Sequence, residues 1–448
     1  MANDWVHTKL GDIFKVKHGF AFKGEYFSDA PTNSFLLTPG NFSTSGGFQD
    51  IKPKYYDGPI PDDYILKPSQ VVVTMTDLSK QSDTLGYAVS IPNDGKVWLH
   101  NQRTGLLEFK KEYPSDPLFI SYLLRSHEYR SWIIGSATGT TVKHTSPTRI
   151  HDFECKIPPL SEQKAIAHIL GSLDNKIELN RQMNETLEAM AQALFKSWFV
   201  DFDPVIDNAL AAGNAIPDEF FERAELRKGI EKKDNSDIQS LFPDEFEFTE
   251  EMGWIPRGWM VESFGDVSIC FDRLRIPLSK KQRESKKPGV IPYHGATSVM
   301  DYINEWILDD IYLLIGEDGS VIKEDGSPFV QYIWGKTWVN NHAHVLQGKN
   351  GVGTEHLMLF MQSQNLTAYI TGAVQLKINQ GNMNRIPFLN SGSKINEKFT
   401  AIINPYYEKV RITAEENETL VKLRDTLLPK LMSGELRITD AEALVENV

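Results

Sequence analysis

Cysteine is scarce in this chain of 448 residues, which contains only Cys155 and Cys270. Two isolated cysteines exclude a disulfide-stapled fold and match none of the paired spacings of structural zinc sites. Long apolar runs are also lacking, because none approaches the roughly 20 residues that cross a bilayer. The first residues, Met1 to Trp5, have neither the basic nor the apolar region of a signal peptide. These absences predict a cytoplasmic protein that does not enter a membrane.

Positive charge is in deficit, because 47 lysines and arginines face 60 aspartates and glutamates, for a formal net charge of −13. A strongly acidic chain is at first sight a poor partner for nucleic acid. However, residues 217–251 hold twelve acidic and five basic side chains, whereas residues 270–300 hold seven basic and two acidic ones. Salt screens surface fields beyond about 10 Å, so the local sign matters more than the sum. The basic run is either a DNA-facing segment or a solvated loop.

Motifs for catalysis are missing as well. The sequence has no glycine-rich loop for S-adenosylmethionine or a nucleotide phosphate. Residues 404–407 (Asn-Pro-Tyr-Tyr) resemble the Asn-Pro-Pro-Tyr loop of adenine methyltransferases but lack its second proline. Asp201 and Asp203 have no third ligand for a metal, and His342 and His344 lack partners for zinc. We therefore expect no enzyme activity, no metal and no cofactor in this chain.

What the chain does contain is an internal repeat. Asn-Glu-Thr-Leu occurs at residues 184–187 and again at 417–420, and Lys-x-Trp-x-x-Asn begins at both Lys96 and Lys336. The offset between the copies falls from 240 residues at the lysines to 233 at the tetrapeptides, so the second copy has shorter loops. A repeat of about 200 residues is too long for a solenoid. It predicts two related domains, each followed by a long helix.

Each copy begins with a strand-rich segment. Residues 71–75 form a β-branched run that is typical of a buried strand, and residues 97–99 predict another strand. Residues 117–132 predict a helix, and residues 355–370 are its counterpart in the second copy. We therefore expect an α+β fold with two strand-rich, mixed α/β domains.

A short helical segment and then a long helix follow each domain. Ser172 is the predicted N-cap of the first long helix, and Asn404 with Pro405 at the first helical position begins the second. Each helix is expected to have about 28 residues and a length of roughly 42 Å.

Both long helices share one heptad frame. A single polar residue lies at mid-length in each, Asn180 in the first and Thr413 in the second, and such a residue typically fixes register. The two stripes bury each other most simply as an antiparallel coiled coil, which would relate the domains by a pseudo-two-fold axis. The alternative is that each helix packs only on its own domain. The expected core positions are Leu173, Ile177, Asn180, Leu187, Leu194, Tyr406, Val410, Thr413, Leu420 and Leu427.

An ordered series of short segments carries a family resemblance. The segments are residues 157–163 (Ile-Pro-Pro-Leu-Ser-Glu-Gln), 196–204 (Lys-Ser-Trp-Phe-Val-Asp-Phe-Asp-Pro), 241–243, 253–259, 293–297, 314–319 and 338–344. The first two, with the long helix between them, resemble the central conserved region of type I restriction–modification specificity subunits. The others resemble the lead-in to that family's second recognition domain and a common class of that domain. The resemblance covers essentially the whole chain.

The resemblance implies a non-catalytic subunit that selects a bipartite, gapped site in double-stranded DNA. Each of two target recognition domains would read one half-site, while the coiled coil would set the spacer and dock two methyltransferase subunits. Two motor–nuclease subunits would complete the restriction enzyme. S-adenosylmethionine, ATP and magnesium would be bound by those partners only. The alternative function is an assembly scaffold in such a complex that does not itself read DNA.

On this basis the chain divides into six parts. The expected parts are recognition domain 1 (1–160), the central helical region (161–203), an acidic connector (204–252), recognition domain 2 (253–393), the C-terminal conserved helix (394–434) and a tail (435–448).

Two loops are the best candidates for base contacts, because arginine pairs with guanine and asparagine or glutamine with adenine. Residues 100–103 and 340–344 occupy corresponding places in the two copies and differ in sequence. Asn101 and Asn341, identical in both copies, more simply cap a turn. The predicted base contacts are Gln102, Arg103, His342 and His344.

Phosphate contacts are predicted where small hydroxyl residues neighbour a basic one. Residues 138–144, followed by Arg149, fit this pattern, and their counterpart at 371–377 keeps the glycine and the lysine. The basic run supplies further candidates, and a solvated loop is the alternative for each. The predicted contacts are Thr140, Thr141, Lys143, His144, Lys280, Lys281, Arg283 and Lys377.

Overall fold

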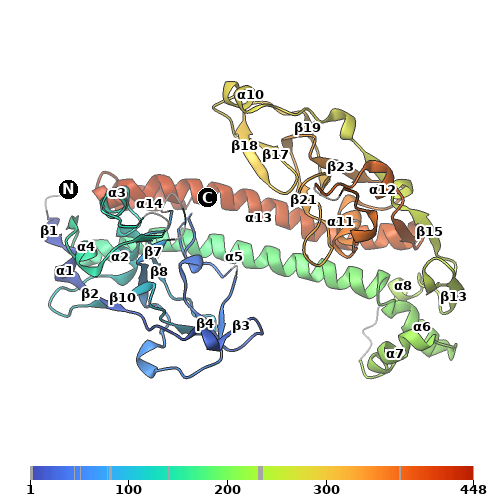
Figure 1. The fold of residues 1–448 in the computed structure, drawn as a ribbon, viewed down its shortest axis with the longest axis horizontal. Coiled ribbons are helices and arrows are strands. Elements are labelled where there is room, and N and C mark those ends of the chain that lie inside the picture. The colour runs from blue at the N-terminus through green and yellow to red at the C-terminus, as the bar shows by residue number, and fades with distance from the viewer. Residues whose placement is uncertain are drawn as a thin grey trace. The chain divides into compact units, whose positions relative to one another are not determined.

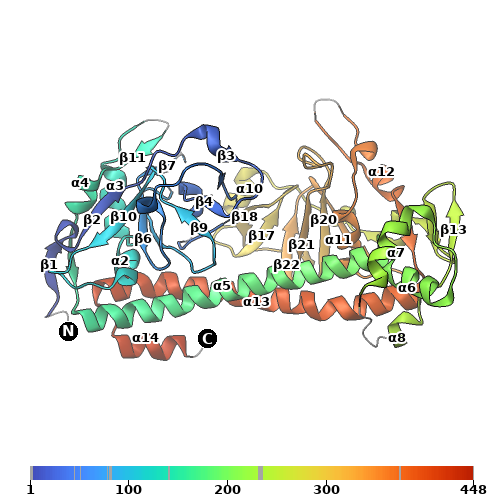
Figure 2. The same cartoon turned by 90° about the horizontal axis from the view of Figure 1, so that it is seen from below.

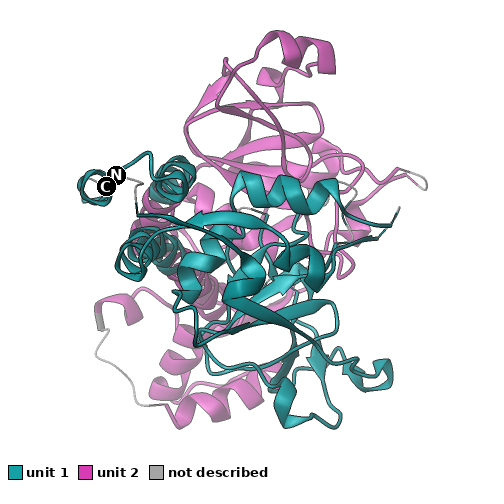
Figure 3. Ribbon diagram, turned by 90° about the vertical axis from the view of Figure 1, so that its left-hand side faces the viewer, with its two compact units in different colours: residues 1–180, 415–448 teal, residues 181–414 magenta. Residues whose placement is uncertain are grey.

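The computed structural model of the protein divides into two compact units (Figures 1 and 3). Unit 1 comprises residues 1–180 with 415–448, and unit 2 comprises residues 181–414. All residues are described except 1–3, 45, 51, 78, 80–82, 140–141, 231–235, 373–374 and 447–448. Within the described residues, no helix is long and apolar enough to cross a membrane. Each unit combines one strand-rich domain with part of each long helix.

Unit 1 is built on two four-stranded sheets with strand orders β2-β10-β6-β8 and β3-β5-β4-β9. Their strands are β2 (Phe14–His18), β3 (Phe27–Ser28), β4 (Ser34–Leu36), β5 (Tyr55–Tyr56), β6 (Val71–Thr74), β8 (Ala88–Ser90), β9 (Val97–Leu99) and β10 (Thr104–Phe109). Two pairs are separate, β1 (Val6–Lys9) with β12 (Glu154–Ile157) and β7 (Thr76–Asp77) with β11 (Lys143–His144). The helices are α1 (Leu10–Ile13), α2 (Pro117–Leu123), α3 (His127–Gly135), α4 (Pro147–His151) and α14 (Ile438–Val445), with short 3-10 turns at Gly24–Tyr26, Pro39–Asn41 and Asp62–Tyr64.

Unit 2 repeats this plan, with sheets ordered β16-β23-β20-β21 and β18-β17-β22-β19. Their strands are β16 (Ser268–Cys270), β17 (Ile291–His294), β18 (Val299–Ile303), β19 (Leu308–Asp309), β20 (Tyr312–Gly316), β21 (Val330–Ile333), β22 (Lys336–Val339) and β23 (Ala343–Gly348). The pairs β13 (Phe246–Thr249) with β14 (Gly253–Pro256) and β15 (Met260–Ser263) with β24 (Pro387–Asn390) lie outside these sheets. The helices are α6 (Asp203–Ala212), α7 (Phe221–Lys228), α8 (Ser236–Gln239), α9 (Phe264–Val267), α10 (Lys280–Ser285), α11 (Thr354–Gln362) and α12 (Gln380–Asn384), with 3-10 turns at Asp218–Phe220, Asp272–Leu274 and Thr367–Tyr369.

The internal repeat is visible in the strand pairing of each unit. In unit 1, β4 runs parallel to β9 and places Phe35 opposite Trp98. In unit 2, β17 runs parallel to β22 and places Tyr293 opposite Trp338. The predicted strand at residues 71–75 is confirmed as β6, whose four residues are all buried. The predicted α+β fold with two strand-rich domains is thus confirmed.

The two long helices are longer than predicted. Helix α5 (Leu160–Phe199) has 40 residues and α13 (Ser393–Ser433) has 41, or about 60 Å each. The predicted starts at Ser172 and Asn404 are wrong, because both residues lie inside continuous helices. Pro405 removes one backbone hydrogen bond from α13. The helix continues because its packing outweighs that loss, with Ile403 and Tyr407 buried on either side of the proline.

The helices pair antiparallel within each unit (Figure 2). In unit 1, Asp174 accepts a hydrogen bond from Arg424 at 2.8 Å, and Asn180 Nδ2 donates to Glu416 Oε2 at 2.8 Å. In unit 2, Thr413 donates to Asn184 Oδ1. Residue numbers rise along α5 as they fall along α13, so the predicted direction is correct.

The predicted core positions of the helix pair are all at least partly buried. Asn180 is 2% exposed and Thr413 is fully buried, as a register-fixing pair requires. The asparagine of the repeated tetrapeptide makes the same kind of contact in each copy. Asn417 Nδ2 donates to the carbonyl of Ile177 at 3.2 Å, and Asn184 Nδ2 donates to that of Val410 at 3.4 Å. Each unit therefore makes the same contact with counterpart residues.

Three local expectations are corrected. The helix expected at 117–132 is two helices, because Ser126 breaks the run and caps α3 by accepting from Tyr129 N. Its counterpart ends at Gln362 instead of Ile370. The expected tail contains α14, where Ala441 is fully buried in the core of unit 1. Apolar spacing alone did not reveal these breaks and contacts.

In its described residues, 204–230 and 236–252, the acidic connector is a folded part of unit 2. Asp203, the first residue of α6, accepts hydrogen bonds from Arg223 at 2.7 and 2.8 Å and from Ser197 at 2.8 Å. Asp207 accepts from Arg227 at 3.1 Å. These pairs fasten α7 to α6, so the aspartates are structural ion-pair partners.

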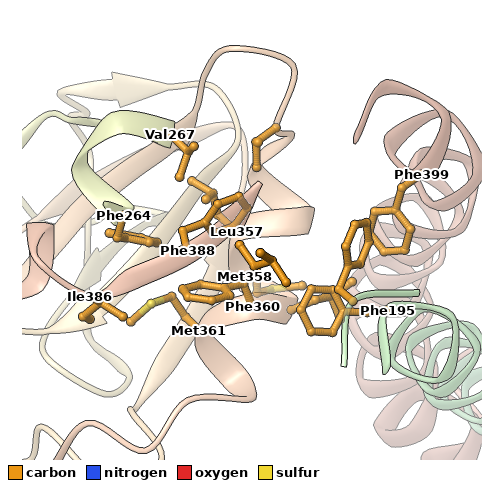
Figure 4. Close-up of a cluster of buried hydrophobic side chains, with 14 of the residues drawn as sticks. Phe195, Phe264, Val267, Leu357, Met358, Phe360, Met361, Ile386, Phe388 and Phe399 are labelled. Carbon is orange, nitrogen blue, oxygen red and sulfur yellow. The ribbon is translucent and has the colours of Figure 1, made fainter. Parts of the chain in front are cut away.

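An aromatic core joins the sheet of unit 2 to its helices (Figure 4). Helix α11 contributes Leu357 and Met361, which belong to the same buried cluster as Phe195 and Phe399 of the long helices. On the helix side, the rings of Phe195 and Phe399 lie 6.2 Å apart. His356 completes the contact, with its ring 4.8 Å from Phe399. This core fixes the strand-rich domain to the helix pair within its own unit.

Candidate nucleic-acid interface

The first predicted base-contacting loop is a tight turn between β9 and β10. Asn101 Oδ1 accepts from the backbone N–H of Arg103 at 3.3 Å, so the predicted capping role of Asn101 is confirmed. His100 is fully buried and hydrogen-bonds to the carbonyl of Thr104 at 3.1 Å. Burial lowers the pKa of His100 to about 4, so it is a neutral core residue. Gln102 and Arg103 are exposed at the tip of the turn.

The second loop is one residue shorter than the first. β22 ends at Val339 and β23 begins at Ala343, and Asn340 Oδ1 accepts from the backbone N–H of His342 at 2.8 Å. Asn340 is therefore the counterpart of Asn101, and the prediction that Asn341 caps the turn is wrong. The repeat aligned Asn341 with Asn101 because the deletion falls inside the motif itself. Asn341 is instead exposed, beside the half-exposed His342.

His344 lies on β23 and is 1% exposed. Its ring nitrogens contact Asp272 Oδ2 at 2.5 Å and the carbonyl of Ile378 at 2.9 Å. The structure does not support the prediction that His344 contacts a base. His342 lies in the turn before β23, whereas His344 is the second residue of that strand, whose first four residues are all buried.

The second predicted loop of each unit is a hairpin of the same construction. Thr138 and His144 exchange backbone hydrogen bonds at 3.1 and 2.9 Å, and Thr371 and Lys377 do so at 2.8 Å in both directions. Gly139 and Gly372 have φ angles of 95° and 89°. An added Cβ would lie 2.0 Å from a carbonyl oxygen at Gly139 and 2.2 Å from one at Gly372. Glycine is therefore required at both positions.

The hairpin geometry also corrects the alignment of the basic residues. His144 occupies the position of Lys377, because both close their hairpins opposite a threonine. Lys143, which was matched to Lys377, is one position earlier and is half-buried. Thr140 and Thr141 lie outside the described residues. Arg149 stacks on Trp132, 3.2 Å from the ring centroid, and is thereby held inside unit 1.

In each unit, the backbone of one residue hydrogen-bonds to both the turn and the hairpin, and this residue is called the junction. In unit 1, the Met75 N–H donates to the carbonyl of Arg103 at 3.0 Å, and Thr145 N–H donates to the carbonyl of Met75 at 3.0 Å. In unit 2, Glu317 N–H donates to the carbonyl of His342 at 2.8 Å, and Ile378 N–H donates to the carbonyl of Glu317 at 2.9 Å. Two loops that were selected separately from the sequence are therefore neighbours in space.

A pocket of about 290 Å³ adjoins the turn of unit 2. It is lined by Gly295, Ala296, Thr297, Ser298, Met300, Asp318 and His342. His342 Nδ1 and Asp318 Oδ1 are 2.5 Å apart, so the pocket wall carries both a hydrogen-bond donor and an acceptor. Its backbone turn and mixed polarity suit the edge of a base or a sugar–phosphate oxygen.

Some side chains of the basic run (residues 270–300) form ion pairs within unit 2, and others are exposed to solvent. Arg283 is mostly buried and donates to Asp301 Oδ2 at 3.0 Å and to the carbonyl of Leu278 at 2.8 Å. Lys280 and Lys281 begin α10, are exposed, and form no ion pair with any residue that the structure describes. Of the three predicted phosphate contacts, Arg283 thus has a structural role, whereas the two lysines face solvent.

Cys270, Asp272 and His344 form a cluster whose ligand atoms lie within 4.8 Å of one another. Two ligands of a tetrahedral zinc ion, each about 2.0 Å from the metal, are roughly 3.3 Å apart. The 2.5 Å separation between Asp272 and His344 is too short for that arrangement and fits a hydrogen bond. Burial raises the pKa of the Cys270 thiol to about 12, which keeps it protonated.

Two exposed amides were not selected from the sequence. Asn341 was assigned to turn capping, and Gln375 lies on the second hairpin, where it faces the solvent. A comparison of the hairpins would have indicated Gln375, because its counterpart Val142 cannot pair with a base edge.

Comparison with known proteins supports a single family. The family model described as the type I restriction modification DNA specificity domain matches residues 2–189 and 256–422. The specificity subunit of the type I restriction enzyme HindI from Haemophilus influenzae is 27% identical over 370 residues, covering 71% of this chain and 77% of that protein. The MjaIX specificity subunit from Methanocaldococcus jannaschii is 26% identical over 351 residues, covering 74% of this chain and 72% of that protein.

Among solved structures, the fold is similar to that of the type I restriction–modification S subunit from M. genitalium. The TM-score is 0.54 at 15% sequence identity, with 95% of this chain and 96% of that chain covered. With two strand-rich domains, a pair of long helices and a family match over both copies of its repeat, the chain belongs to the type I restriction–modification DNA specificity family.

Proposed function

We propose that this specificity subunit reads a bipartite, gapped site in double-stranded DNA, with one half-site for each unit. As a member of its family the chain has a role in DNA sequence specificity and is not itself catalytic. The observation that carries the proposal is the meeting of turn and hairpin at Met75 in unit 1 and at Glu317 in unit 2. Each junction brings exposed side chains from two loops to one place.

The side chains at the two junctions differ, which favours two different half-sites. Unit 1 offers Arg103, suited to the O6 and N7 atoms of guanine, and Gln102, suited to adenine. Unit 2 offers the amides of Asn341 and Gln375, both suited to adenine. The other proposed contacts, to phosphates or bases, are Lys143, His144, Lys280, Lys281, His342 and Lys377.

The helix pair is proposed to set the spacer and to dock the partner subunits. Helices α5 and α13 run through both units, and a longer pair would separate the two readers by more base pairs, at about 3.4 Å each. Two methyltransferase subunits and two motor–nuclease subunits are the proposed partners. Those subunits would supply the sites for S-adenosylmethionine, ATP and magnesium.

Single-molecule sequencing for N6-methyladenine tests the proposal. Cells with the intact operon are compared with cells that lack only this gene. We expect a gapped two-part motif that disappears on deletion, which reveals both half-sites at once. A motif that persists unchanged contradicts the proposal.

The second candidate function is an assembly scaffold that does not read DNA. It is distinguished by Gln102 and Arg103, which are exposed and lie outside the helix pair. Under the reading proposal, Gln102→Ala with Arg103→Ala changes one half of the motif and leaves the other. A scaffold would leave the whole motif unchanged.

A further inference from the structure

Unit 2 contains a buried charge cluster behind its junction of turn and hairpin. Arg275 donates to Glu317 Oε2 at 2.6 Å and lies 3.2 Å from Asp272 Oδ2. His344 lies 2.5 Å from Asp272 Oδ2 and 3.9 Å from Glu317 Oε2. Lys377 reaches Glu317 Oε1 at 3.2 Å from the solvent side. Two carboxylates are thus shared among three potential cations.

Both ring nitrogens of His344 face oxygen acceptors. Nδ1 contacts the Asp272 carboxylate, and Nε2 contacts the carbonyl of Ile378 at 2.9 Å. The ring is therefore held at both nitrogens, by the side chain of Asp272 and by the backbone of Ile378. Burial alone would raise the pKa of Asp272, but the hydrogen bond from His344 holds it below its usual value. The cluster is therefore a set of paired charges, which is the form in which charge is tolerated in an interior.

The cluster ends at the base of the second hairpin. Ile378, whose carbonyl is bound by His344, directly follows Lys377, which closes the hairpin. Glu317 binds the Lys377 ammonium through its side chain and the Ile378 N–H through its backbone carbonyl, at 2.9 Å. Three separate contacts thus fix the point from which the hairpin leaves the domain.

Among its described residues, unit 1 has no counterpart to this cluster. Met75 occupies the position of Glu317, because each joins its own turn and hairpin. Gly105 occupies the position of His344, since Gly105 pairs with Val73 on β6 and His344 pairs with Ile315 on β20. The first hairpin is instead held by a contact of 3.3 Å between His144 and Thr76. An effect of the cluster should therefore be confined to one half-site.

We propose that His344 is a positioning residue for the second half-site, and that its bond to Ile378 holds the second hairpin in the orientation that reads DNA. This inference rests on the proposed function, because it assumes that unit 2 reads DNA beside that hairpin. His344 does not touch DNA itself. It acts through Ile378 and, by way of Asp272, Arg275 and Glu317, through Lys377.

Two substitutions of His344 distinguish a positioning role from a purely structural role in the core. In His344→Gln, the longer side chain keeps an amide donor near the place of Nε2, and so retains the bond to Ile378 while losing that to Asp272. In His344→Asn, the shorter side chain keeps a donor near the place of Nδ1, and so retains the bond to Asp272 while losing that to Ile378. Both variants carry the same neutral amide, so each is the matched control for the other.

The test uses the full chain assembled with its methyltransferase subunits. Methylation rates are measured on duplexes that carry the wild-type motif or a single base-pair change in either half-site. We expect His344→Asn to reduce discrimination in the second half-site by about tenfold, while discrimination in the first half-site is unchanged. His344→Gln should retain most of the discrimination. Glu317→Gln, which releases Lys377, should also reduce discrimination in the second half-site only.

The proposal would be overturned if both His344 variants lost discrimination in the second half-site equally and their melting temperatures fell equally. That result would show a purely structural role for His344. Unchanged discrimination in His344→Asn and Glu317→Gln would overturn it as well. Failure of the proposed function is distinguishable, because the wild-type complex would then methylate no gapped motif that depends on this chain. If His344→Asn does not assemble, Glu317→Gln and His344→Gln alone decide the matter through their opposite expected effects.

Discussion

At the scale of single residues, His356 is a titratable group that is almost completely removed from water. It is nearly fully buried, and its ring lies 4.6 Å from that of Phe199 and 4.8 Å from that of Phe399. Burial lowers the pKa of His356 to about 3, and its Nδ1 atom has no hydrogen-bond partner among the described residues. The residue therefore acts as one more aromatic ring of the core in its neutral form.

This burial predicts an acid-sensitive unit 2. The unfolded chain protonates His356 below about pH 6.5, whereas the folded chain resists protonation down to about pH 3, so stability falls as pH falls through that window. We expect His356→Phe to remove about 2 kcal/mol of the stability lost between pH 7.5 and 5, at ~1.4 kcal/mol per pKa unit. Denaturant unfolding at both pH values measures the difference. An equal pH dependence in the wild type and in His356→Phe would contradict the prediction.

A second residue-scale prediction concerns the basic run. Lys280→Gln with Lys281→Gln should reduce the slope of log affinity against log salt by up to about two units, because each phosphate contact contributes ~0.9. Arg283→Gln should leave that slope unchanged and instead destabilise the β17–β18 hairpin, since it loses Asp301. The assembled complex and a motif-bearing duplex are used for both. An unchanged slope in the lysine variant would place α10 outside the DNA interface.

At the scale of elements, the heptad frame predicted which helix faces meet, and local capping rules failed to predict where the helices begin. Capping residues describe the end of an isolated helix. Asn404 and Pro405 have that character, yet Ile403 and Tyr407 are buried on either side of them. Tertiary packing therefore determines where the helix begins, whereas the sequence pattern predicts only which face of the helix is buried.

The helix pair supplies an element-scale prediction. Asn180 Nδ2 donates to Glu416 and also to Asn417 Oδ1 at 3.0 Å, so Asn180→Ala removes two hydrogen bonds between the helices. We expect a loss of about 1–3 kcal/mol in the unfolding free energy. The exposed Met190→Ala, on the same helix, should cost under about 0.5 kcal/mol. Equal effects in thermal or denaturant unfolding would mean that Asn180 does not hold the pair together.

The candidate site was predicted in part at this scale. The repeat identified both turns and both hairpins, because the residues that close them recur in sequence. It misassigned Asn341, because a deletion inside the turn shifts the alignment by one residue. It also selected His344, since a sequence does not show that a strand begins at Ala343 and turns the next side chain inward. Contacts such as that between Asp272 and His344 join distant segments and have no local signal.

At the scale of the whole molecule, the order of segments in the chain differs from their grouping in space. Unit 1 is discontinuous, because residues 1–180 are completed by 415–448. The C-terminal part of α13 contributes Leu420, Leu427 and Leu431 to the core that contains Leu173 of α5. An antiparallel pairing of the helices makes this grouping necessary, whereas the expected division into successive segments treated the last residues as a tail.

The grouping predicts that a cut near the C-terminus damages the N-terminal domain. Ending the chain at Ala414 removes three buried leucines and α14 from unit 1, and it also removes Arg424, the buried partner of Asp174. Losing one buried leucine costs about 2–5 kcal/mol, so several together exceed the stability of an ordinary domain. We expect strands β6 and β10 to lose protection from hydrogen exchange, while β20 and β23 remain protected.

The same measurement contains its own control, because unit 2 keeps every residue from 181 to 414 in the shortened chain. A smaller deletion of residues 434–448 removes α14 but leaves the leucines of α13 in place, and it should weaken protection in unit 1 by less. Exposure of both units to equal extents would mean that they fold as one cooperative body. Loss of protection confined to unit 2 would contradict the grouping, since no described residue of the deleted segment belongs to its core.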